Sequence, residues 1–392
     1  MVNHLQYLKD EIDNLKKQNL FTPLPILGDE QKARTIINGK EVINLSANNY
    51  LGFANHPRIR KAAKEAIDKW GFGVGAVRQI CGTMPIHLEF EEQLAKYKKT
   101  EASLVFVAGI AANRGTIQAI MGEEDVIISD ELNHGSIIDG VRLVKCERKI
   151  YPHRDMKGLE QALKESQKFK RRLVVTDGVF SMDGDIAPLD EIAELAEKYD
   201  AITMVDDAHG DGVLGKDGRG IIDHFNIHGK IDIDMGTLSK AFACLGGYIA
   251  GKQELKDYLI QRARSFIFTT AHPPAVVAAC MEAIKMVQDE PQHVKNLWKN
   301  TKYFKEKIQA LGFNTGRSQT PITPIIVGES KNAIRLSEET FKEGLFAKPI
   351  VYPLVSKDTS RVRTIVTAIH TKEDLDEAVD IFERVGKRLN LI

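Results

Sequence analysis

Apolar, β-branched runs alternate with amphipathic stretches along the first two thirds of the chain. In the stretch after Pro188, which suits the first position of a helix, Leu189, Ile192, Leu195 and Ala196 recur at helical spacing. Strands that alternate with helices predict an α/β domain with a mostly parallel sheet covered on both faces. The runs that we expect to be strands are Val42–Ala47, Ala102–Val107, Asp125–Ser129, Arg148–Pro152, Arg172–Phe180, Ala201–His209, Asp232–Lys240 and Gly246–Gly251.

The pattern changes after about Pro291, where long helical stretches separate fewer strands. Thr371 and Asp374 form a capping-box pattern at the start of the last helix, and Leu375 and Phe382 lie on its apolar face. The strands expected here are 321–328, Phe346–Val355 and Arg361–Ala368. We therefore expect an N-terminal helical segment over 1–45, a large domain over 46–290 and a smaller α+β domain over 291–392.

The composition excludes several classes of protein. The 392 residues include 54 basic and 54 acidic side chains, so the formal net charge is zero, whereas nucleic-acid binding usually brings a basic excess. The hydrophobic share of 43% is that of a chain with a sizeable core. Ala102–Asn113 is among the longest uncharged stretches, and it is well short of the roughly 20 apolar residues of a membrane helix.

The four cysteines are far apart in the sequence and form no CxxC pair. No cluster of Cys and His has the spacing of a zinc site, so we expect neither a disulfide framework nor a bound metal. The N-terminal stretch mixes acidic and basic residues and lacks the apolar segment of a signal peptide. These features predict a cytoplasmic protein that binds neither membrane nor nucleic acid.

Lys240 provides the sharpest chemical signal. It closes the motif Gly236-Thr-Leu-Ser-Lys, which follows an expected strand. The carboxyl edge of a parallel sheet is where such folds bind ligands, and a primary amine there can form a Schiff base with a carbonyl cofactor. A lysine taken alone is more often a solvated surface residue, so the residues around Lys240 determine whether a Schiff-base role is the better interpretation.

Asp206 and His209 stand at the end of the preceding expected strand, in the sequence VDDAH. A carboxylate at the pyridine nitrogen of pyridoxal phosphate keeps that nitrogen protonated and makes the ring an electron sink. His209 could then hydrogen-bond the ring hydroxyl oxygen. By themselves the two residues could equally be a metal-ligand pair or a polar strand end, but Lys240 further along the chain favours the cofactor.

Other expected strand ends provide the remaining parts of a cofactor site. Gly109 opens a helix whose free backbone N–H groups would suit a phosphate, and His134 could stack on a flat heterocycle. Ser181 follows another strand, and Arg363 could bind a carboxylate through its planar fork, although a surface ion pair is the alternative. No GxxxxGK[ST] or GxSxG sequence occurs, which argues against P-loop NTPases and α/β-hydrolases.

In this order, these residues resemble the α-oxoamine synthases, pyridoxal-phosphate enzymes of the aspartate-aminotransferase (type I) fold that condense an amino acid with an acyl-CoA. The resemblance runs from NLSANNYLGFANHP to RVRTIVTAIHT. Within the family, VRQICGT, MVDDAHGDGVLG and GTLSKAFACLGGY look most like the glycine C-acetyltransferases, also called 2-amino-3-ketobutyrate CoA ligases. The 8-amino-7-oxononanoate synthases typically have SNDYLG and Leu-Ser-His where this chain has ANNYLG and Leu132, Asn133 and His134.

This resemblance implies a reaction of glycine with acetyl-CoA that gives 2-amino-3-oxobutyrate and coenzyme A, or its reverse in threonine degradation. The alternative is an 8-amino-7-oxononanoate synthase that uses alanine and pimeloyl-CoA, or an enzyme that performs both reactions. A catalytically silent partner subunit is a further alternative. Retention of Lys240 together with Asp206, His209 and His134 argues against it, because a silent subunit does not need the Schiff-base lysine.

The resemblance also assigns roles at the cofactor ring. Lys240 would hold the cofactor covalently and later remove the α-proton of the amino acid. Asp206 would pair with the pyridinium nitrogen and His209 with the ring oxygen, while His134 would stack on the ring and face the substrate. The same four residues would be the catalytic ones.

The resemblance also assigns the residues that bind the phosphate. Gly109 and Ile110 would donate backbone N–H groups to the phosphate, together with Thr237 and, across a homodimer interface, Thr269 and Thr270.

Ser181 would lie against both cofactor and substrate, and Asn48 and Arg363 would hold the amino acid, with Arg363 as the carboxylate anchor. Asp211 and Arg114 depart from the family pattern and could alter coenzyme A affinity.

Overall fold

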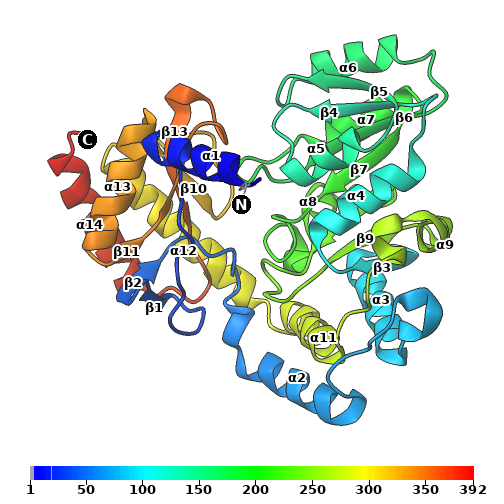
Figure 1. The fold of residues 1–392 in the computed structure, drawn as a ribbon, viewed down its shortest axis with the longest axis horizontal. Coiled ribbons are helices and arrows are strands. Elements are labelled where there is room, and N and C mark those ends of the chain that lie inside the picture. The colour runs from blue at the N-terminus through cyan, green and yellow to red at the C-terminus, as the bar shows by residue number, and fades with distance from the viewer. Residues whose placement is uncertain (1–3, 19) are drawn as a thin grey trace.

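A twisted seven-stranded sheet lies at the centre of the larger part of the molecule (Figure 1). The computed structural model describes residues 4–18 and 20–392. The sheet is parallel except for β9, which runs antiparallel to its neighbours β3 and β8, and this confirms the α/β expectation. In spatial order its strands are β3 (Ala102–Phe106), β9 (Gly247–Gly251), β8 (Ile233–Thr237), β7 (Ile202–Asp206), β6 (Arg172–Asp177), β4 (Val126–Asp130) and β5 (Glu147–Tyr151).

Both faces of this sheet are covered by helices because successive strand residues point to opposite sides. In β3, Leu104 packs into the apolar cluster on one face and Val105 into the cluster on the other. The first face is covered by α4 (Gly109–Ile120), α5 (Gly135–Arg142), α9 (Gln253–Arg262) and α10 (Arg264–Ile267). The second is covered by α3 (Pro85–Lys98), α6 (Met156–Glu165), α7 (Leu189–Lys198), α8 (Ile221–Phe225) and α11 (Pro274–Asp289), with α2 (Pro57–Trp70) packed on α11.

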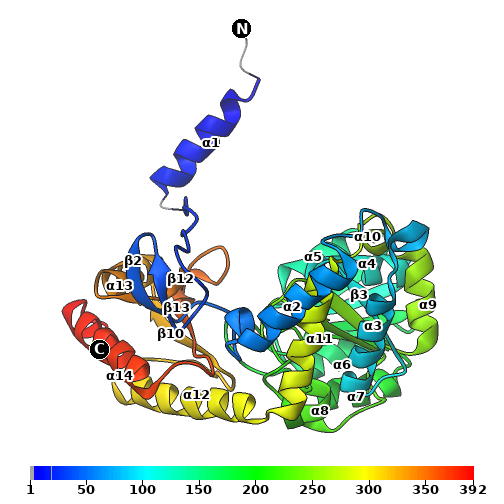
Figure 2. The ribbon, with the colours of Figure 1, turned by 90° about the horizontal axis from the view of Figure 1, so that it is seen from below.

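The long helix α12 (Gln292–Ala310) leads from this body to the C-terminal elements (Figure 2). In α14, Thr371 Oγ1 accepts a hydrogen bond from Asp374 N while Asp374 Oδ2 accepts one from Thr371 N, so the expected capping box is confirmed. The expected strand over Phe346–Val355 is wrong in length, because only short pieces pair. The elements here are β10 (Ile322–Gly328), α13 (Ser330–Lys342), β11 (Leu345–Phe346), β12 (Lys348–Ile350), β13 (Ser360–Ile365) and α14 (Lys372–Arg388).

The segment before residue 46 contains more than the expected helix. The strands β1 (Arg34–Ile37) and β2 (Lys40–Asn44) form a hairpin, and β2 also pairs with β11. Ile43 and Leu45 are buried in the same apolar cluster as Phe304 and Phe382. Strands β10, β13 and β12 form a separate sheet, and the division into domains stays a prediction.

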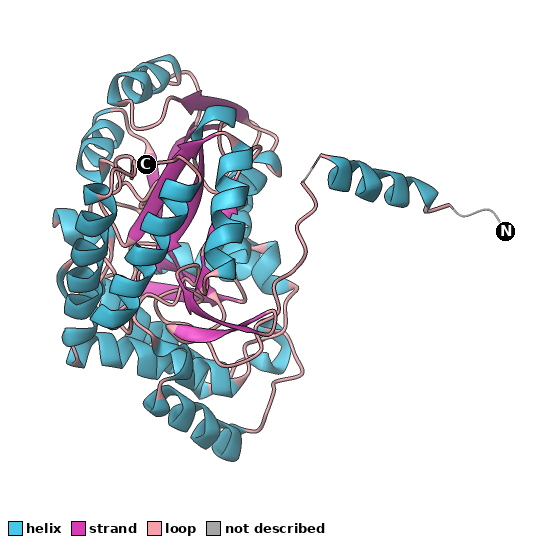
Figure 3. Cartoon of the chain, turned by 90° about the vertical axis from the view of Figure 1, so that its left-hand side faces the viewer, coloured by secondary structure: helices cyan, strands magenta, loops and turns pink. Residues whose placement is uncertain are grey.

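Helix α1 (Gln6–Lys17) stands clear of the rest of the chain and buries none of its residues (Figures 2 and 3). None of the helices in the described part of the chain combines the length and the apolar character needed to cross a membrane. The remaining helical elements are short turns: η1 (Phe53–Asn55), η2 (Arg78–Gly82), η3 (Lys216–Gly218) and η4 (Lys357–Thr359).

The carboxyl ends of β3, β4, β6, β7 and β8 all meet at one edge of the large sheet, because these strands are parallel to one another. Polar residues that are far apart in the sequence therefore come together there, among them Asp130, Asp177, Asp206 and Thr237 at the strand ends. This edge is the position at which open α/β sheets bind ligands.

Candidate active site

A cavity of about 260 Å³ opens at this edge of the sheet. Its lining mixes apolar side chains with a few convergent polar groups, as is typical of a ligand site. Most of the site residues expected from the sequence line it, and they come from five different strand ends. They are Gly109, Ile110, His134, Ser181, Asp206, His209, Thr237 and Lys240.

Lys240 follows β8 and points its half-buried amine into the cavity. Burial lowers the pKa of this amine to about 8, although the carboxylates of Asp206 and Asp177 oppose the shift. A lysine with such a pKa is neutral in an appreciable fraction of molecules near neutral pH. It can therefore act as a nucleophile and as a base.

Asp206 is buried at the end of β7, and both of its carboxylate oxygens are hydrogen-bonded. The backbone N–H of Ala208 donates to Oδ1 at 3.0 Å, and Asn113 Nδ2 on α4 donates to Oδ2 at 2.7 Å. Asn113 also donates to Ser136 Oγ at 2.8 Å. Asn113 and Ser136 were not expected from the sequence, and they fix the carboxylate in one orientation.

His209 is buried and neutral. Burial holds its pKa well below the usual range, and the nearby charges of Lys240 and Arg363 act in the same direction. Its Nδ1 atom lies 2.7 Å from the hydroxyl of Tyr50, a second residue that sequence reasoning missed. When the Tyr50 hydroxyl donates to Nδ1, the proton of the neutral ring is on Nε2, and this atom can donate to a ligand oxygen in the cavity.

His134 caps the start of α5 and lies on the wall of the cavity. Its backbone N–H donates to Asp177 Oδ2 at 3.0 Å, and its Nδ1 atom lies 2.7 Å from Ser136 Oγ. Burial lowers the pKa of this imidazole, and the charge of Lys240 adds to that effect while Asp206 opposes it. A neutral, fixed ring of this kind suits stacking on a flat ligand.

The N-terminus of α4 provides a cradle for an anion. Its N-cap residue, Ala108, has no side chain that can bond the free N–H groups of the first turn. A Cβ atom at Gly109 would lie 3.1 Å from Met235 and 3.4 Å from Thr237 Oγ1, so glycine gives the backbone a close approach to β8. The Thr237 hydroxyl lies 2.9 Å from the Ser239 hydroxyl at the same end of the cavity.

Asn48 and Arg363 do not line the cavity themselves, but Arg363 contacts Ser181, which does, and Asn48 contacts Arg363. Arg363 donates from Nη1 to the carbonyl of Ser181 at 3.1 Å and from Nη2 to Asn48 Oδ1 at 3.0 Å. Thr269 and Thr270 lie elsewhere in the chain, beside a small void next to Phe106. Their predicted contribution across a dimer interface stays a prediction.

The two residues that depart from the family pattern are held by ion pairs. Asp211 Oδ1 lies 2.8 Å from the buried amine of Lys98, which also lies 3.1 Å from the carboxylates of Asp207 and Asp234. None of the four residues of this cluster is among those that line the cavity. Arg114 pairs with Asp139. Their effect on coenzyme A affinity stays a prediction.

These residues fit pyridoxal phosphate. The uncapped helix start suits its phosphate, the Asp206 carboxylate suits a protonated ring nitrogen, and the Lys240 amine suits its aldehyde. The fold and the site thus define a pyridoxal-phosphate enzyme of the aspartate-aminotransferase type. The family model described as aminotransferase class I and II matches residues 40–382 of this chain.

Comparison with known proteins shows to which group within this family the chain belongs. An 8-amino-7-oxononanoate synthase of Thermoanaerobacter pseudethanolicus is 57% identical over 392 residues, which is 100% of this chain and 99% of that one. The 8-amino-7-oxononanoate synthase 1 of Bacillus subtilis is 50% identical, with 100% of both chains covered. A structure of serine palmitoyltransferase from S. paucimobilis, solved with PLP and myriocin, matches with a TM-score of 0.94 at 28% identity over both full chains. The chain belongs to the α-oxoamine synthase family of pyridoxal-phosphate-dependent, acyl-transferring enzymes.

The expectation that glycine and acetyl-CoA are the substrates is wrong. The full-length relatives at 50–57% identity are 8-amino-7-oxononanoate synthases, so neither that pair of substrates nor threonine degradation is supported. Asn133 was one of the residues that suggested it. The structure shows this side chain buried, with bonds to Ser129 Oγ, the carbonyl of Val175 and the N–H of Asp177. These bonds hold the turn after β4 against β6, and Asn133 is not among the residues that line the cavity.

Proposed function

We propose that this enzyme is an 8-amino-7-oxononanoate synthase, which joins alanine to the acyl group of pimeloyl-CoA. The observation that carries the proposal is identity of 50–57% over the whole chain with proteins of that name. A structure of the Francisella tularensis protein of the same name also matches, with a TM-score of 0.77 at 27% identity over 88% of this chain and 98% of that one.

The carbon balance defines the steps that the site must support. Alanine and the pimeloyl group together hold one carbon more than an oxononanoate, so the amino-acid carboxylate leaves as carbon dioxide. Coenzyme A leaves as a thiol when the new carbon–carbon bond forms. The enzyme must therefore remove the proton at the alanine α-carbon, admit the thioester there, and return a proton after carbon dioxide has left.

Bound pyridoxal phosphate supplies a protonated ring that delocalises negative charge from the amino-acid α-carbon. Asp206, oriented by Asn113, holds the proton at the ring nitrogen, and His209 donates from Nε2 to the ring oxygen. His134 covers the ring. The Lys240 amine, with its pKa near 8, takes the α-proton and later returns one.

Arg363 binds the alanine carboxylate through its guanidinium fork, and Asn48 keeps the guanidinium in place through the 3.0 Å bond to its side-chain oxygen. The carbonyl of Ser181 holds the second terminal nitrogen. This placement sets the carboxylate at the Ser181 end of the cavity.

The phosphate is held by the backbone N–H groups of Gly109 and Ile110 and by the Thr237 hydroxyl. Thr269 and Thr270 are outside the cavity of their own chain, and in this proposal they complete the phosphate site of a second copy. The enzyme is then a homodimer with shared sites.

Alanine labelled in its carboxyl group tests the proposed reaction. With pimeloyl-CoA, labelled carbon dioxide should form in step with the coenzyme A thiol, and neither should form with the Lys240→Ala variant. Release of the thiol without labelled carbon dioxide would contradict the proposal, because it would show that the carboxylate stays in the product.

A further inference from the structure

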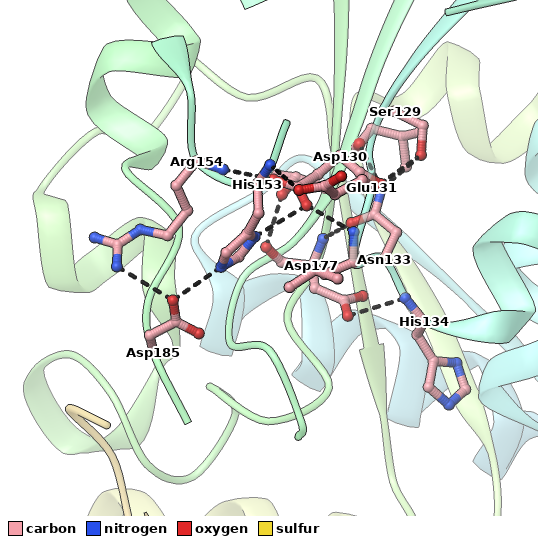
Figure 4. A network of polar contacts seen from close by, with 12 residues as sticks. Ser129, Asp130, Glu131, Asn133, His134, His153, Arg154, Asp177 and Asp185 are labelled. Atoms are coloured by element: carbon pink, nitrogen blue, oxygen red, sulfur yellow. Dashed lines mark hydrogen bonds and ion pairs between the residues drawn. The ribbon is translucent and has the colours of Figure 1, made fainter. Parts of the chain in front are cut away.

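Two loops that carry cavity residues are joined by a histidine outside the cavity. His153 lies in the turn after β5, and its side chain is 19% exposed. Its Nδ1 atom lies 3.0 Å from Asp130 Oδ1, and its Nε2 atom lies 2.9 Å from Asp185 Oδ2 (Figure 4). Asp130 ends β4, whereas Asp185 belongs to the loop after β6.

The geometry requires the imidazolium form. Carboxylate oxygens accept hydrogen bonds and cannot donate them, so a ring with a carboxylate at each nitrogen needs a proton on both. The paired carboxylates raise the pKa of His153 to about 9 against the opposing effect of its burial. Arg154 adds a second cation, with Nη1 at 3.2 Å from Asp185 Oδ2. Two cations therefore balance two carboxylates.

Asp130 connects His153 to the turn that leads to His134. Its Oδ1 atom also accepts the N–H of Leu132 at 2.9 Å, and its Oδ2 atom accepts the N–H of Arg154 at 3.0 Å. The N–H of His153 donates to Glu131 Oε1 at 2.8 Å. The turn that leads to His134 is therefore tied to the turn after β5 through side-chain and backbone bonds.

Asp185 connects His153 to the loop that contains Ser181. Its carbonyl accepts the N–H of Phe180, which closes the loop that presents Ser181 to the cavity. The Phe180 ring packs edge-on against the His153 ring, with centroids 4.3 Å apart. Arg363 bonds the Ser181 carbonyl on the other side of the same loop.

We infer that His153 is a positioning residue, whose bridge between Asp130 and Asp185 sets the spacing between the His134 and Ser181 walls of the cavity. The bridge consists only of contacts within and between the two loops, and it involves neither the acyl-CoA nor the proposed reaction.

Hydrogen exchange of the cofactor-free chain tests the bridge without any substrate. His153→Gln removes the charge and can donate to only one of the two carboxylates at a time. We expect faster exchange of backbone amides in both loops, at 131–134 and at 180–186. The matched control is His228→Gln, because the His228 ring bonds the carboxylate of Asp223 at 2.9 Å without bridging two loops of the cavity, and its side chain is similarly exposed at 22%. The control should leave both loops unchanged.

Turnover gives a second, independent readout. In the cofactor-loaded enzyme, His153→Gln should lower kcat by on the order of tenfold, with a smaller change in the KM for the amino acid, because misplaced groups slow the reaction more than they weaken binding. The alanine and pimeloyl-CoA pair is the assay, and any pair that the wild-type enzyme turns over serves equally.

A double-mutant cycle shows whether the effect passes through Asp185. If His153 acts by holding that carboxylate, Asp185→Asn added to His153→Gln should lower kcat little further than the single change. Additive losses would overturn the inference. So would unchanged exchange in either loop of His153→Gln, since a bridge must release both ends.

Discussion

Burial alone does not select the reactive lysine. Burial lowers the pKa of Lys305 on α12 to about 8, which matches the value for Lys240. The Lys305 amine, however, donates to the carbonyls of Ser318 and Thr320, each at 3.0 Å, and lines no part of the cavity. Lys240 instead faces a cavity that also holds Asp206. The cavity, and not the pKa, determines which amine meets the cofactor.

Borohydride reduction of the cofactor-loaded enzyme should therefore fix the cofactor to Lys240 and leave Lys305 unlabelled. The measurement is mass spectrometry of the digested protein. Lys240→Ala should show no fixed cofactor, whereas Lys305→Ala should be labelled as the wild type is. Labelling of Lys305, or of the Lys240→Ala variant, would show that the lysine has been assigned wrongly.

For individual residues, the sequence predicts the cavity residues that follow strands, but it misses the residues whose hydrogen bonds hold them in place. Lys240, Asp206 and His209 could be predicted, because parallel strands bring their carboxyl ends together. Tyr50 and Asn113 could not, because each bonds a partner that lies far away in the sequence, 159 residues for Tyr50 to His209 and 93 for Asn113 to Asp206. Only the folded chain brings these pairs into contact.

Among the elements, the loop after β6 is the place where the large sheet meets β13. Arg361 on β13 lies 2.5 Å from Asp183. The carbonyl of Gly184 accepts bonds from Gln319 N and Thr320 Oγ1, each at 2.9 Å. The contacts of this loop therefore connect Ser181 to the C-terminal elements.

Gly184→Ala should destabilise the protein strongly. Gly184 has a φ of +74°, and a Cβ atom there would lie 2.5 Å from the carbonyl oxygen of Ile322, a backbone atom that cannot turn aside. Gly229→Ala is the control, because its φ is +82° with no atom within 4 Å of the added Cβ. The control carries only the backbone strain, of about 1 kcal/mol.

The free energy of unfolding of Gly184→Ala should therefore fall below that of the control by roughly 1–3 kcal/mol. Denaturant titration measures both. Equal losses in the two variants would show that the loop yields to the extra atom.

The hydrophobic pattern does not predict where a strand ends or which distant strand it pairs with. The apolar run over Phe346–Val355 reads as one strand, yet β12 ends at Ile350, and Pro353 beyond it has no N–H group to donate to a sheet. The parallel pairing of β2 with β11 joins residues about 300 positions apart, as in Leu345 with Ile43. No local pattern encodes such a partner.

For the molecule as a whole, the His153 bridge makes stability depend on pH. Folding raises the pKa of His153 from an ordinary value of 6.5 to about 9, so the bridge contributes fully below about pH 6.5 and is lost as the pH rises through about 9. The free energy of unfolding should fall over this window by roughly 3 kcal/mol at most. In His153→Gln this component should be absent, and an unchanged fall would assign it to other groups.

A shared site predicts that an inactive variant and a weakened variant restore activity in a mixed dimer. Lys240→Ala lacks the amine but keeps both threonines, whereas a Thr269→Ala, Thr270→Ala variant keeps the amine and should bind the cofactor more weakly. In a mixed dimer, one site receives its amine and its threonines from different chains and is complete. When the two are unfolded and refolded together, activity should exceed the sum of the activities of the separate variants. Activity no higher than the sum of the separate variants would contradict the shared site.

The identity of the acyl donor is the part of the account that the site residues could not predict. The motifs around Lys240, Asp206 and His134 are predicted to serve the cofactor, which every member of the family uses, and one methylene in an acyl pocket changes binding by only about 1–3 kcal/mol. The proposed donor, pimeloyl-CoA, therefore rests on full-length similarity to the oxononanoate synthases and not on the motifs.

The most direct test is a competition in one vessel. The cofactor-loaded enzyme receives alanine and glycine together with pimeloyl-CoA and acetyl-CoA at equal concentrations, and mass spectrometry identifies the products at early times. The ratio of products then shows which pair of substrates the enzyme selects. The account predicts that 8-amino-7-oxononanoate predominates. A predominance of 2-amino-3-oxobutyrate, or of its decarboxylation product aminoacetone, would contradict it.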